Sequence, residues 1–342
     1  MQNKVAIMEV CGTHTMAIAR FGIRSLLPAN VKLISGPGCP VCVTPINAID
    51  KAIALSKKEN VIIATFGDML KVPGSYSSLN KERSNGATVK IVYSPIDALD
   101  IAKENPHKEV VFIGVGFETT SPIIAATIIQ AKRLKITNFS VLCLFKVIPP
   151  ALKFIAENKI CKINALLLPG HVSTIIGSNT YKFLASKYKL PGVVASFSYR
   201  EITKAIKLLT SMVKNNKACI VTQCSDIVSA QGNKKAQAVL SKVFKIVNSD
   251  WRAIGIIAKS GYAIKNQYAA YDAEKKFNIK TKSKKEPKNC LCGAVMLGQK
   301  IPTQCSLFAK ICTPSSAVGP CMVSSEGACA AEYKYGKNIK RK

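Results

Sequence analysis

Between residues 31 and 200, short apolar runs alternate with segments of helical pattern. The runs are continuous rather than alternating with polar residues, which predicts strands buried on both faces. Such strands separated by helices are typical of parallel sheets covered by helices. The predicted strands are 31–35, 61–66, 89–93, 110–114, 139–143 and 165–168.

Two of these units end in a Pro/Gly loop that carries a reactive residue, Cys39 in one and His171 in the other. This repetition predicts two similar parallel-sheet α/β domains, residues 1–105 and 106–200. Beyond Arg200 the pattern becomes helical, so residues 201–342 are expected to form a third, mainly helical domain with a cysteine-rich end. Its candidate helices are 201–215, 234–247 and 264–277.

The chain has 342 residues, of which 48% are hydrophobic, enough for two or three domains with cores of their own. No stretch approaches the roughly 20 apolar residues that cross a bilayer. The first residues lead directly into an apolar run without a signal-peptide pattern. We therefore expect a cytoplasmic protein without membrane association.

The formal charge of +30 raises the possibility of a nucleic-acid partner. Its lysines are spread along the chain, and neither a recognition motif nor a row of stacking aromatic residues accompanies them. We expect no nucleic-acid function, because charge alone governs solubility and nonspecific association.

The thirteen cysteines point to metal or redox chemistry, since cytosolic thiols are kept reduced and a chain of this size needs no disulfide framework. Three cluster near the start and six near the end. Of the others, Cys143, Cys161 and Cys219 are interpreted as small hydrophobic core residues.

The strongest pattern is Cys290-x14-Cys305-x6-Cys312-x16-Cys329. Four thiolates in a weakly periodic segment can hold either zinc or a [4Fe–4S] cluster. The segment lacks the paired CxxC motifs usual for zinc, which favours a cluster. Two cysteines remain in this region: Cys292 is an alternative to Cys290 as first ligand, and Cys321 is a further thiol with a structural role.

A second motif, Cys39-Pro-Val-Cys42, lies between a predicted strand and a predicted helix that starts at Thr44-Pro45. A helix N-terminus stabilises thiolate, which suits redox or ligand cysteines. The alternative is two unreactive thiols in a tight turn. A third motif places Cys11 and His14 after the apolar run 5–8, where they could bind a soft metal, or the imidazole could activate the thiol. Alternatively, they form a buried structural pair.

Two polar loops complete the candidates. The loop 114–122 contains Glu118, follows a strand and opens a helix, a geometry that can receive an anion. His171 follows the strand 165–168, at the end where α/β sheets place functional groups. The alternative for His171 is an ordinary surface histidine.

Together these motifs resemble the HypD family of hydrogenase formation proteins over nearly the whole chain. The sequence departs from the family pattern at Lys146, where a histidine is expected, and around Arg200-Glu201 and residues 222–226. The segments that carry the resemblance are MEVCGTHTM (8–16), SGPGCPVCVTP (35–45), ATFGDML (64–70), GFETT (116–120), PGHVS (169–173) and MVSSEGACAA (322–331).

The resemblance implies two similar α/β domains and a third domain whose [4Fe–4S] cluster is held by Cys290, Cys305, Cys312 and Cys329. It implies assembly of an iron carrying cyanide and carbon monoxide, with a HypC chaperone and the cyanide donor HypE as partners. Cys11 would be the ligand of that iron, and Cys39 with Cys42 a redox pair. The supporting polar residues or proton donors would be His14, His171, Glu118 and Glu326.

Two other functions remain open at this point. One is a stand-alone thiol/disulfide reductase in which the CxxC motif works with the cluster on a protein substrate. The other is a structural zinc protein that acts as an adaptor. The leading prediction is a [NiFe]-hydrogenase maturation factor that serves as scaffold and redox protein.

Overall fold

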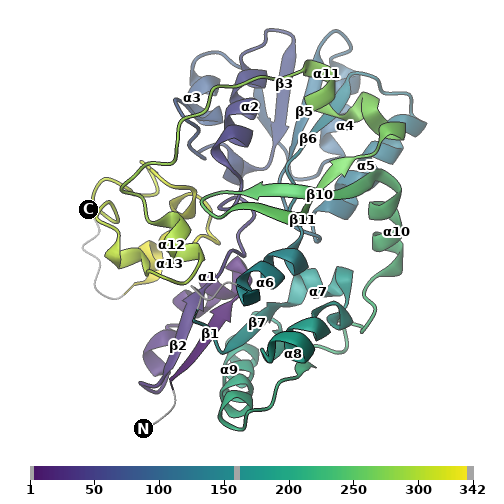
Figure 1. The fold of residues 1–342 in the computed structure, drawn as a ribbon. Coiled ribbons are helices and arrows are strands. Elements are labelled where there is room, and N and C mark those ends of the chain that lie inside the picture. Colours follow the sequence, from purple (N-terminus) through teal and green to yellow (C-terminus); the bar gives the residue numbers. More distant parts are fainter. Residues whose placement is uncertain (1–3, 158–161, 337–342) are drawn as a thin grey trace. The chain divides into compact units, whose positions relative to one another are not determined.

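The computed structural model describes residues 4–157 and 162–336. The chain divides into two compact units, each assembled from separated stretches of sequence (Figure 1). This division differs from the three consecutive ranges expected from the sequence. Unit 1 consists of Met1–Cys42, Ile148–Lys234 and Pro287–Lys342, and unit 2 consists of Val43–Val147 and Lys235–Glu286.

The sheet of unit 1 is parallel throughout, with five strands in the order β2-β1-β7-β8-β9 among the described residues. From β1 the chain adds β2 on one side, whereas β7, β8 and β9 follow on the other. The strand order therefore reverses between β1 and β7, the position where α/β sheets usually bind ligands. The strands are β1 (Val5–Glu9), β2 (Val31–Ser35), β7 (Ala165–Pro169), β8 (Gly192–Ala195) and β9 (Ile220–Thr222).

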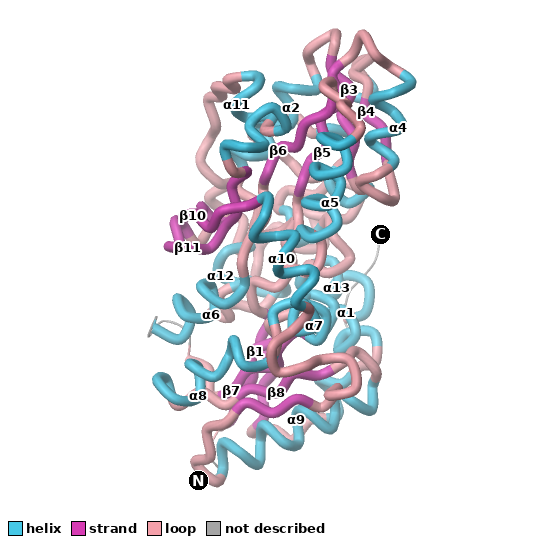
Figure 2. The backbone as a smooth tube through the Cα atoms, turned by 90° about the vertical axis from the view of Figure 1, so that its right-hand side faces the viewer, coloured by secondary structure: helices cyan, strands magenta, loops and turns pink. Residues whose placement is uncertain are grey.

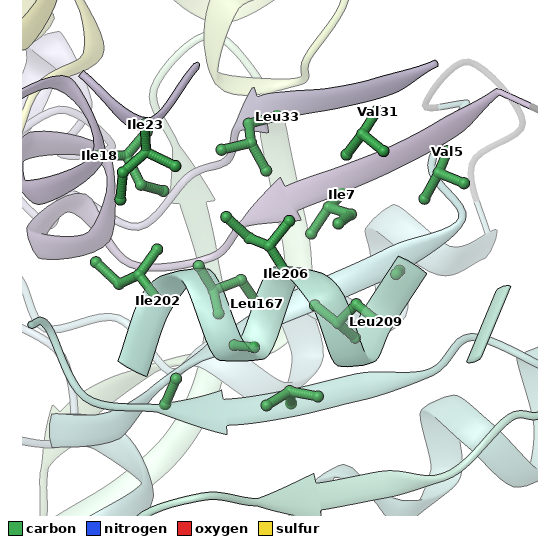
Figure 3. Packing of buried hydrophobic residues seen from close by; sticks show 14 of the residues in the cluster. Val5, Ile7, Ile18, Ile23, Val31, Leu33, Leu167, Ile202, Ile206 and Leu209 are labelled. Atoms are coloured by element: carbon green, nitrogen blue, oxygen red, sulfur yellow. The ribbon is translucent and has the colours of Figure 1, made fainter. Parts of the chain in front are cut away.

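The core of unit 1 lies between this sheet and two helices, α1 (Gly12–Arg20) and α9 (Tyr199–Lys214) (Figure 3). Three apolar residues of α9 at helical spacing, Ile202, Ile206 and Leu209, are fully or almost fully buried. Each buried side chain of this size stabilises the fold by about 1.5–3 kcal/mol. The core thereby fixes the strands whose carboxyl ends carry the candidate site.

The C-terminal segment packs on the residues of β1 and β2 that point away from this core. A Cβ atom at Gly298 would lie 2.2 Å from Cγ2 of Ile34 and 3.6 Å from Cε of Met8. Gly298 also has a φ of +70°, a conformation that favours glycine. This contact attaches the cysteine-rich end of the chain to its first two strands. The remaining helices of unit 1 are α6 (Ile148–Glu157), α7 (Gly170–Ile176), α8 (Lys182–Tyr188), α12 (Cys292–Met296) and α13 (Ala328–Tyr335).

Unit 2 has its own parallel sheet, with strand order β4-β3-β5-β6, and an antiparallel hairpin of β10 and β11 (Figure 2). Its strands are β3 (Val61–Thr65), β4 (Val89–Ile91), β5 (Glu109–Gly114), β6 (Phe139–Cys143), β10 (Phe244–Trp251) and β11 (Gly255–Ile264). Its helices are α2 (Ile46–Ser56), α3 (Leu79–Ser84), α4 (Asp97–Glu104), α5 (Ser121–Arg133), α10 (Lys234–Val243) and α11 (Ala273–Phe277).

The parallel-sheet α/β prediction is confirmed, and each of the six predicted strands is present. The expectation of a mainly helical segment after residue 200 is wrong at the hairpin β10–β11, whose first strand takes the last four residues of the predicted helix 234–247. Strand β10 is mostly exposed and carries polar residues, so it lacks the continuous apolar run that identified the other strands. No described helix is both long and apolar enough to cross a membrane.

Candidate thiol and metal site

The candidate site lies at the carboxyl edge of the sheet in unit 1. Because its strands are parallel, the loops that follow them meet at one edge. Cys11 follows β1, the CxxC loop follows β2, His171 follows β7 and Phe197 follows β8. Cys11 and His171 thus flank the point where the strand order reverses.

Cys11 is the N-cap of α1 and is half-buried. Burial, and then the negative charge of Glu326, raise the pKa of its thiol to about 11. The backbone N–H groups of Thr13 and His14 and the Thr13 hydroxyl act in the opposite direction, because they stabilise the thiolate. Cys11 is therefore protonated at neutral pH in the free protein, and a metal that binds it must displace a proton.

Glu326 reaches this site from the C-terminal segment of unit 1. Its Oε1 atom accepts a hydrogen bond of 2.5 Å from the Thr13 hydroxyl. A Cβ atom at Gly12 would lie 2.6 Å from the Cβ atom of Glu326. The glycine of the Cys-Gly-Thr-His motif therefore permits this close approach, and it places a carboxylate beside Cys11.

The two predicted histidines share contacts with Phe197. The Phe197 ring centroid lies 4.6 Å from that of His14 and 4.3 Å from that of His171. His14 is fully buried, and burial lowers the pKa of its imidazole to about 4, so the ring is neutral. Its Nε2 atom is bonded to the carbonyl oxygen of Ser196 at 3.1 Å. His14 interacts with the thiol of Cys11 through its backbone N–H. His171 is exposed to solvent.

Cys39 and Cys42 form a buried disulfide. Their loop packs against Cys11: the N–H of Gly12 donates to the carbonyl of Gly38 at 3.0 Å, and a Cβ at Gly38 would lie 2.6 Å from Cα of Cys11. The first helical residue of α2 is Ile46, with Pro45 as N-cap, so the helix begins one turn beyond the disulfide.

The C-terminal segment gathers six cysteines around one pocket. Two of them, Cys292 and Cys321, form a disulfide. The other four cysteines that line the pocket are Cys290, Cys305, Cys312 and Cys329, the same four as in the predicted ligand set. Burial raises the pKa of Cys329, and the neighbouring Cys312, Cys290 and Cys305 raise it further, in that order.

These four thiols fit an all-sulfur cluster in residue type and in convergence on one pocket. The N–H of Val318 donates to Sγ of Cys312 at 3.3 Å, the kind of bond that tunes cluster sulfurs. A Cβ at Gly319 would lie 2.7 Å from Sγ of Cys290, so a side chain there would displace this cysteine. Within the described ranges, no three His, Cys, Asp or Glu side chains stand in the arrangement of a single-ion site.

The pocket, the two disulfides and Cys11 are linked by direct contacts within unit 1. Sγ of Cys42 lies 3.9 Å from the carbonyl oxygen of Pro320, the residue before Cys321. A Cβ at Gly327 would lie 2.2 Å from the carbonyl oxygen of Cys321, so the segment that carries Glu326 packs on the second disulfide. These contacts connect the segments that carry the sulfur groups of unit 1.

The remaining predicted site residue, Glu118, belongs to unit 2, where it is buried between β5 and α5. Sequence reasoning gave no role to Thr13 or Phe197, although the Cys-Gly-Thr-His motif contains the former. Cys143 and Cys219, expected in the core, are half-buried, and Cys161 lies outside the described residues.

Comparison with known proteins gives the same family that these motifs indicate. The family model named HypD, described as the hydrogenase formation hypA family, matches residues 1–336. The chain is 44% identical to a hydrogenase maturation factor HypD from Azotobacter vinelandii, over 98% of this chain and 90% of the relative. It is 42% identical to the protein of that name from Escherichia coli K12, again over 98% and 90% of the two chains.

Proposed function

The chain belongs to the HypD family of hydrogenase maturation factors, and on that premise we propose that it is a scaffold and redox protein for assembly of the iron centre of a [NiFe]-hydrogenase. The observation that carries the proposal is the placement within unit 1 of a free thiol, two disulfides and a pocket with four further thiols, each in contact with the next. A scaffold for a low-valent metal needs such a soft ligand next to a source of electrons.

In this proposal Cys290, Cys305, Cys312 and Cys329 hold a resident [4Fe–4S] cluster. When bound, the cluster supplies electrons one at a time. Cys292 is already paired with Cys321, which favours Cys290 as the first ligand. Gly319 leaves the space beside the sulfur of Cys290, and the Val318 N–H supports the sulfur of Cys312.

The disulfides would carry reducing equivalents toward Cys11. Two electrons from an external reductant and two protons from solvent would convert the Cys292–Cys321 disulfide to two thiols. By thiol–disulfide exchange these thiols reduce Cys39–Cys42 and return to the disulfide, so that electrons and protons balance. The contact between Cys42 and Pro320 supports this order, since it brings the first disulfide next to the second.

Cys11 would bind the cargo, an iron that carries cyanide and carbon monoxide. The thiol must lose its proton to become a ligand, and Glu326 accepts it with the Thr13 hydroxyl between them. His14, neutral and buried, holds the loop after β8 through Ser196. His171 is proposed as a polar support of this site, and Glu118 as a buried polar support within unit 2. From the family resemblance we also propose a HypC-type chaperone and a HypE-type cyanide donor as partners.

The test is metal analysis of anaerobically purified protein, alone and after co-purification with a HypC-type chaperone. Four irons and four sulfides per chain are expected in the protein alone. Infrared bands of cyanide and carbon monoxide with one additional iron are expected in the complex. Zinc without sulfide would contradict the cluster, and a complex without those bands, from cells able to make the ligands, would contradict the scaffold.

The alternative function is a stand-alone thiol/disulfide reductase, which the two disulfides of unit 1 also favour. A Cys11→Ala variant separates the two, with Cys143→Ala as the matched control. Loss of the additional iron with retention of disulfide reduction would assign Cys11 to iron binding. Retention of both the additional iron and disulfide reduction would favour the reductase.

A further inference from the structure

A groove on unit 1 lies outside the thiol site. It runs along α9 and the segment that joins α1 to β2, and it encloses about 720 Å³. Its lining residues are Ile23, Leu26, Leu27, Pro28, Val31, Tyr199, Thr203, Ile206, Lys207, Thr210, Ser211, Lys214 and Asn215.

Large apolar side chains stand open to solvent around this groove. Leu26 is 63% exposed, Tyr199 is 46% exposed and Phe21 is 40% exposed. Phe21 and Tyr199 pack edge to face, with ring centroids 6.0 Å apart, so the two form one surface. Contiguous exposed apolar surface of this kind marks an interaction site more often than a solvated surface.

The residues that α9 contributes recur every three or four positions from Tyr199 to Lys214. They therefore form one stripe along the helix, about 22 Å long at 1.5 Å per residue. A second helix of about 15 residues matches that length, and helix-in-groove recognition uses apolar residues at the same spacing.

The charged side chains that line the groove are all basic. Its lining, all within the described ranges, includes Lys207 and Lys214 and no Asp or Glu. Both lysines are exposed at the rim, where charge complementarity sets partner choice. A second copy of the chain is a poor occupant, since each copy carries a formal charge of +30.

We propose that this groove is the docking site of an acidic amphipathic helix that belongs to a partner protein. Apolar side chains of that helix would cover Leu26, Leu27 and Tyr199, and its carboxylates would face Lys207 and Lys214. The proposal goes beyond the thiol chemistry and uses none of the cysteines. Failure of docking would therefore leave the iron and sulfide content unchanged.

The experiment begins with the photocrosslinker p-benzoylphenylalanine in place of Leu26 or Tyr199 in the full chain, expressed in cells that make the hydrogenase. The same group in place of Ile256, which is 75% exposed in unit 2, is the control. Mass spectrometry identifies the crosslinked segment, which is then synthesised and titrated against the full chain by fluorescence anisotropy. We expect a segment of 12–16 residues with Asp or Glu beside apolar positions three or four apart, captured at 26 and 199 but not at 256.

The double variant Lys207→Glu/Lys214→Glu should weaken binding of that peptide at least tenfold and reduce its salt dependence. Lys204→Glu is the matched control: Lys204 is exposed on the same helix but outside the groove, and its replacement should change affinity less than twofold. Circular dichroism and iron content verify the fold of each variant. No crosslink above the control, capture of a second copy or of a segment that is not acidic, or equal effects of the Lys204 and Lys207/Lys214 changes would overturn the proposal.

Discussion

The Thr13 hydroxyl donates a 2.5 Å hydrogen bond to Glu326, although 313 positions of sequence separate the two residues. The bond attaches the C-terminal segment to the first turn of α1, next to Cys11. It also places a negative charge where it opposes ionisation of the thiol. The proton affinity of the proposed iron ligand therefore depends on a residue from the far end of the chain.

Replacement of Glu326 by Gln should lower the pKa of Cys11 from its value of about 11, because the opposing charge disappears while a hydrogen-bond acceptor for Thr13 remains. Alkylation of Cys11 by iodoacetamide at pH 8–9, followed by peptide mass spectrometry, should become about three- to tenfold faster, since the thiolate reacts. Glu332→Gln is the control, because Glu332 is not among the groups that shift Cys11. An unchanged rate in Glu326→Gln would show that burial alone sets this pKa.

Cys290 and Cys292 are two positions apart, but their replacement should have opposite effects on the iron and sulfide content. Cys290→Ser should lose most of the iron and sulfide, because a ligand of the proposed cluster is removed. Cys292→Ser should keep the iron and sulfide and lose disulfide reduction, since Cys292 is bonded to Cys321. Iron and acid-labile sulfide assays on anaerobic protein decide between them. Equal loss of iron in both variants would refute the assignment of ligand and disulfide.

Gly38→Ala should destabilise unit 1 by about 3 kcal/mol or more, because its Cβ would lie 1.8 Å from the carbonyl oxygen of Val10 and backbone would have to move. For a unit of this size, the expected loss in Tm is about 6–12 °C by differential scanning calorimetry. Gly67→Ala is the matched control, because its nearest neighbour would be 3.9 Å away. Equal Tm values for the two variants would contradict the close approach at Cys11.

Lys146 should make the stability of unit 2 depend on pH. Its ammonium is buried and bonded to Ser249 Oγ at 2.6 Å and to the Asp250 carbonyl at 2.7 Å. Burial lowers the pKa of Lys146 from 10.5 to about 8, so the folded state binds fewer protons than the unfolded state between these values. The free energy of unfolding should therefore rise from pH 8 to pH 10.5, by at most about 3 to 4 kcal/mol.

The measurement for this prediction is urea unfolding followed by fluorescence of Trp251, which is the only tryptophan in the sequence and is fully buried in unit 2. The wild type should gain stability relative to Lys146→Met across this pH range. Lys245→Met, at an exposed position of the same hairpin, should keep the wild-type slope. Parallel curves for wild type and Lys146→Met would show that Lys146 titrates with a pKa near its usual value.

The sequence alone was sufficient for the elements whose pattern is local. Continuous apolar runs predicted the buried strands, and the Cys-Gly-Thr-His and CxxC motifs predicted which thiols follow β1 and β2. The spacing of Cys290, Cys305, Cys312 and Cys329 marked them as a candidate ligand set, and the structure places all four at one pocket together with Cys292 and Cys321. Chemical type and spacing are properties of a short segment, so they can be recognised before the chain is folded.

Only the tertiary structure decided which segments are neighbours. Apolar periodicity identifies a strand but not its partner, so the pairing of β1 with β7 and the two discontinuous units were not predictable from the runs themselves. The hairpin β10–β11 was missed because a mostly exposed strand gives no continuous apolar signal. Likewise, the pairing of Cys292 with Cys321 and the contact of Glu326 with Thr13 join residues distant in sequence, and long-range packing alone brings them together.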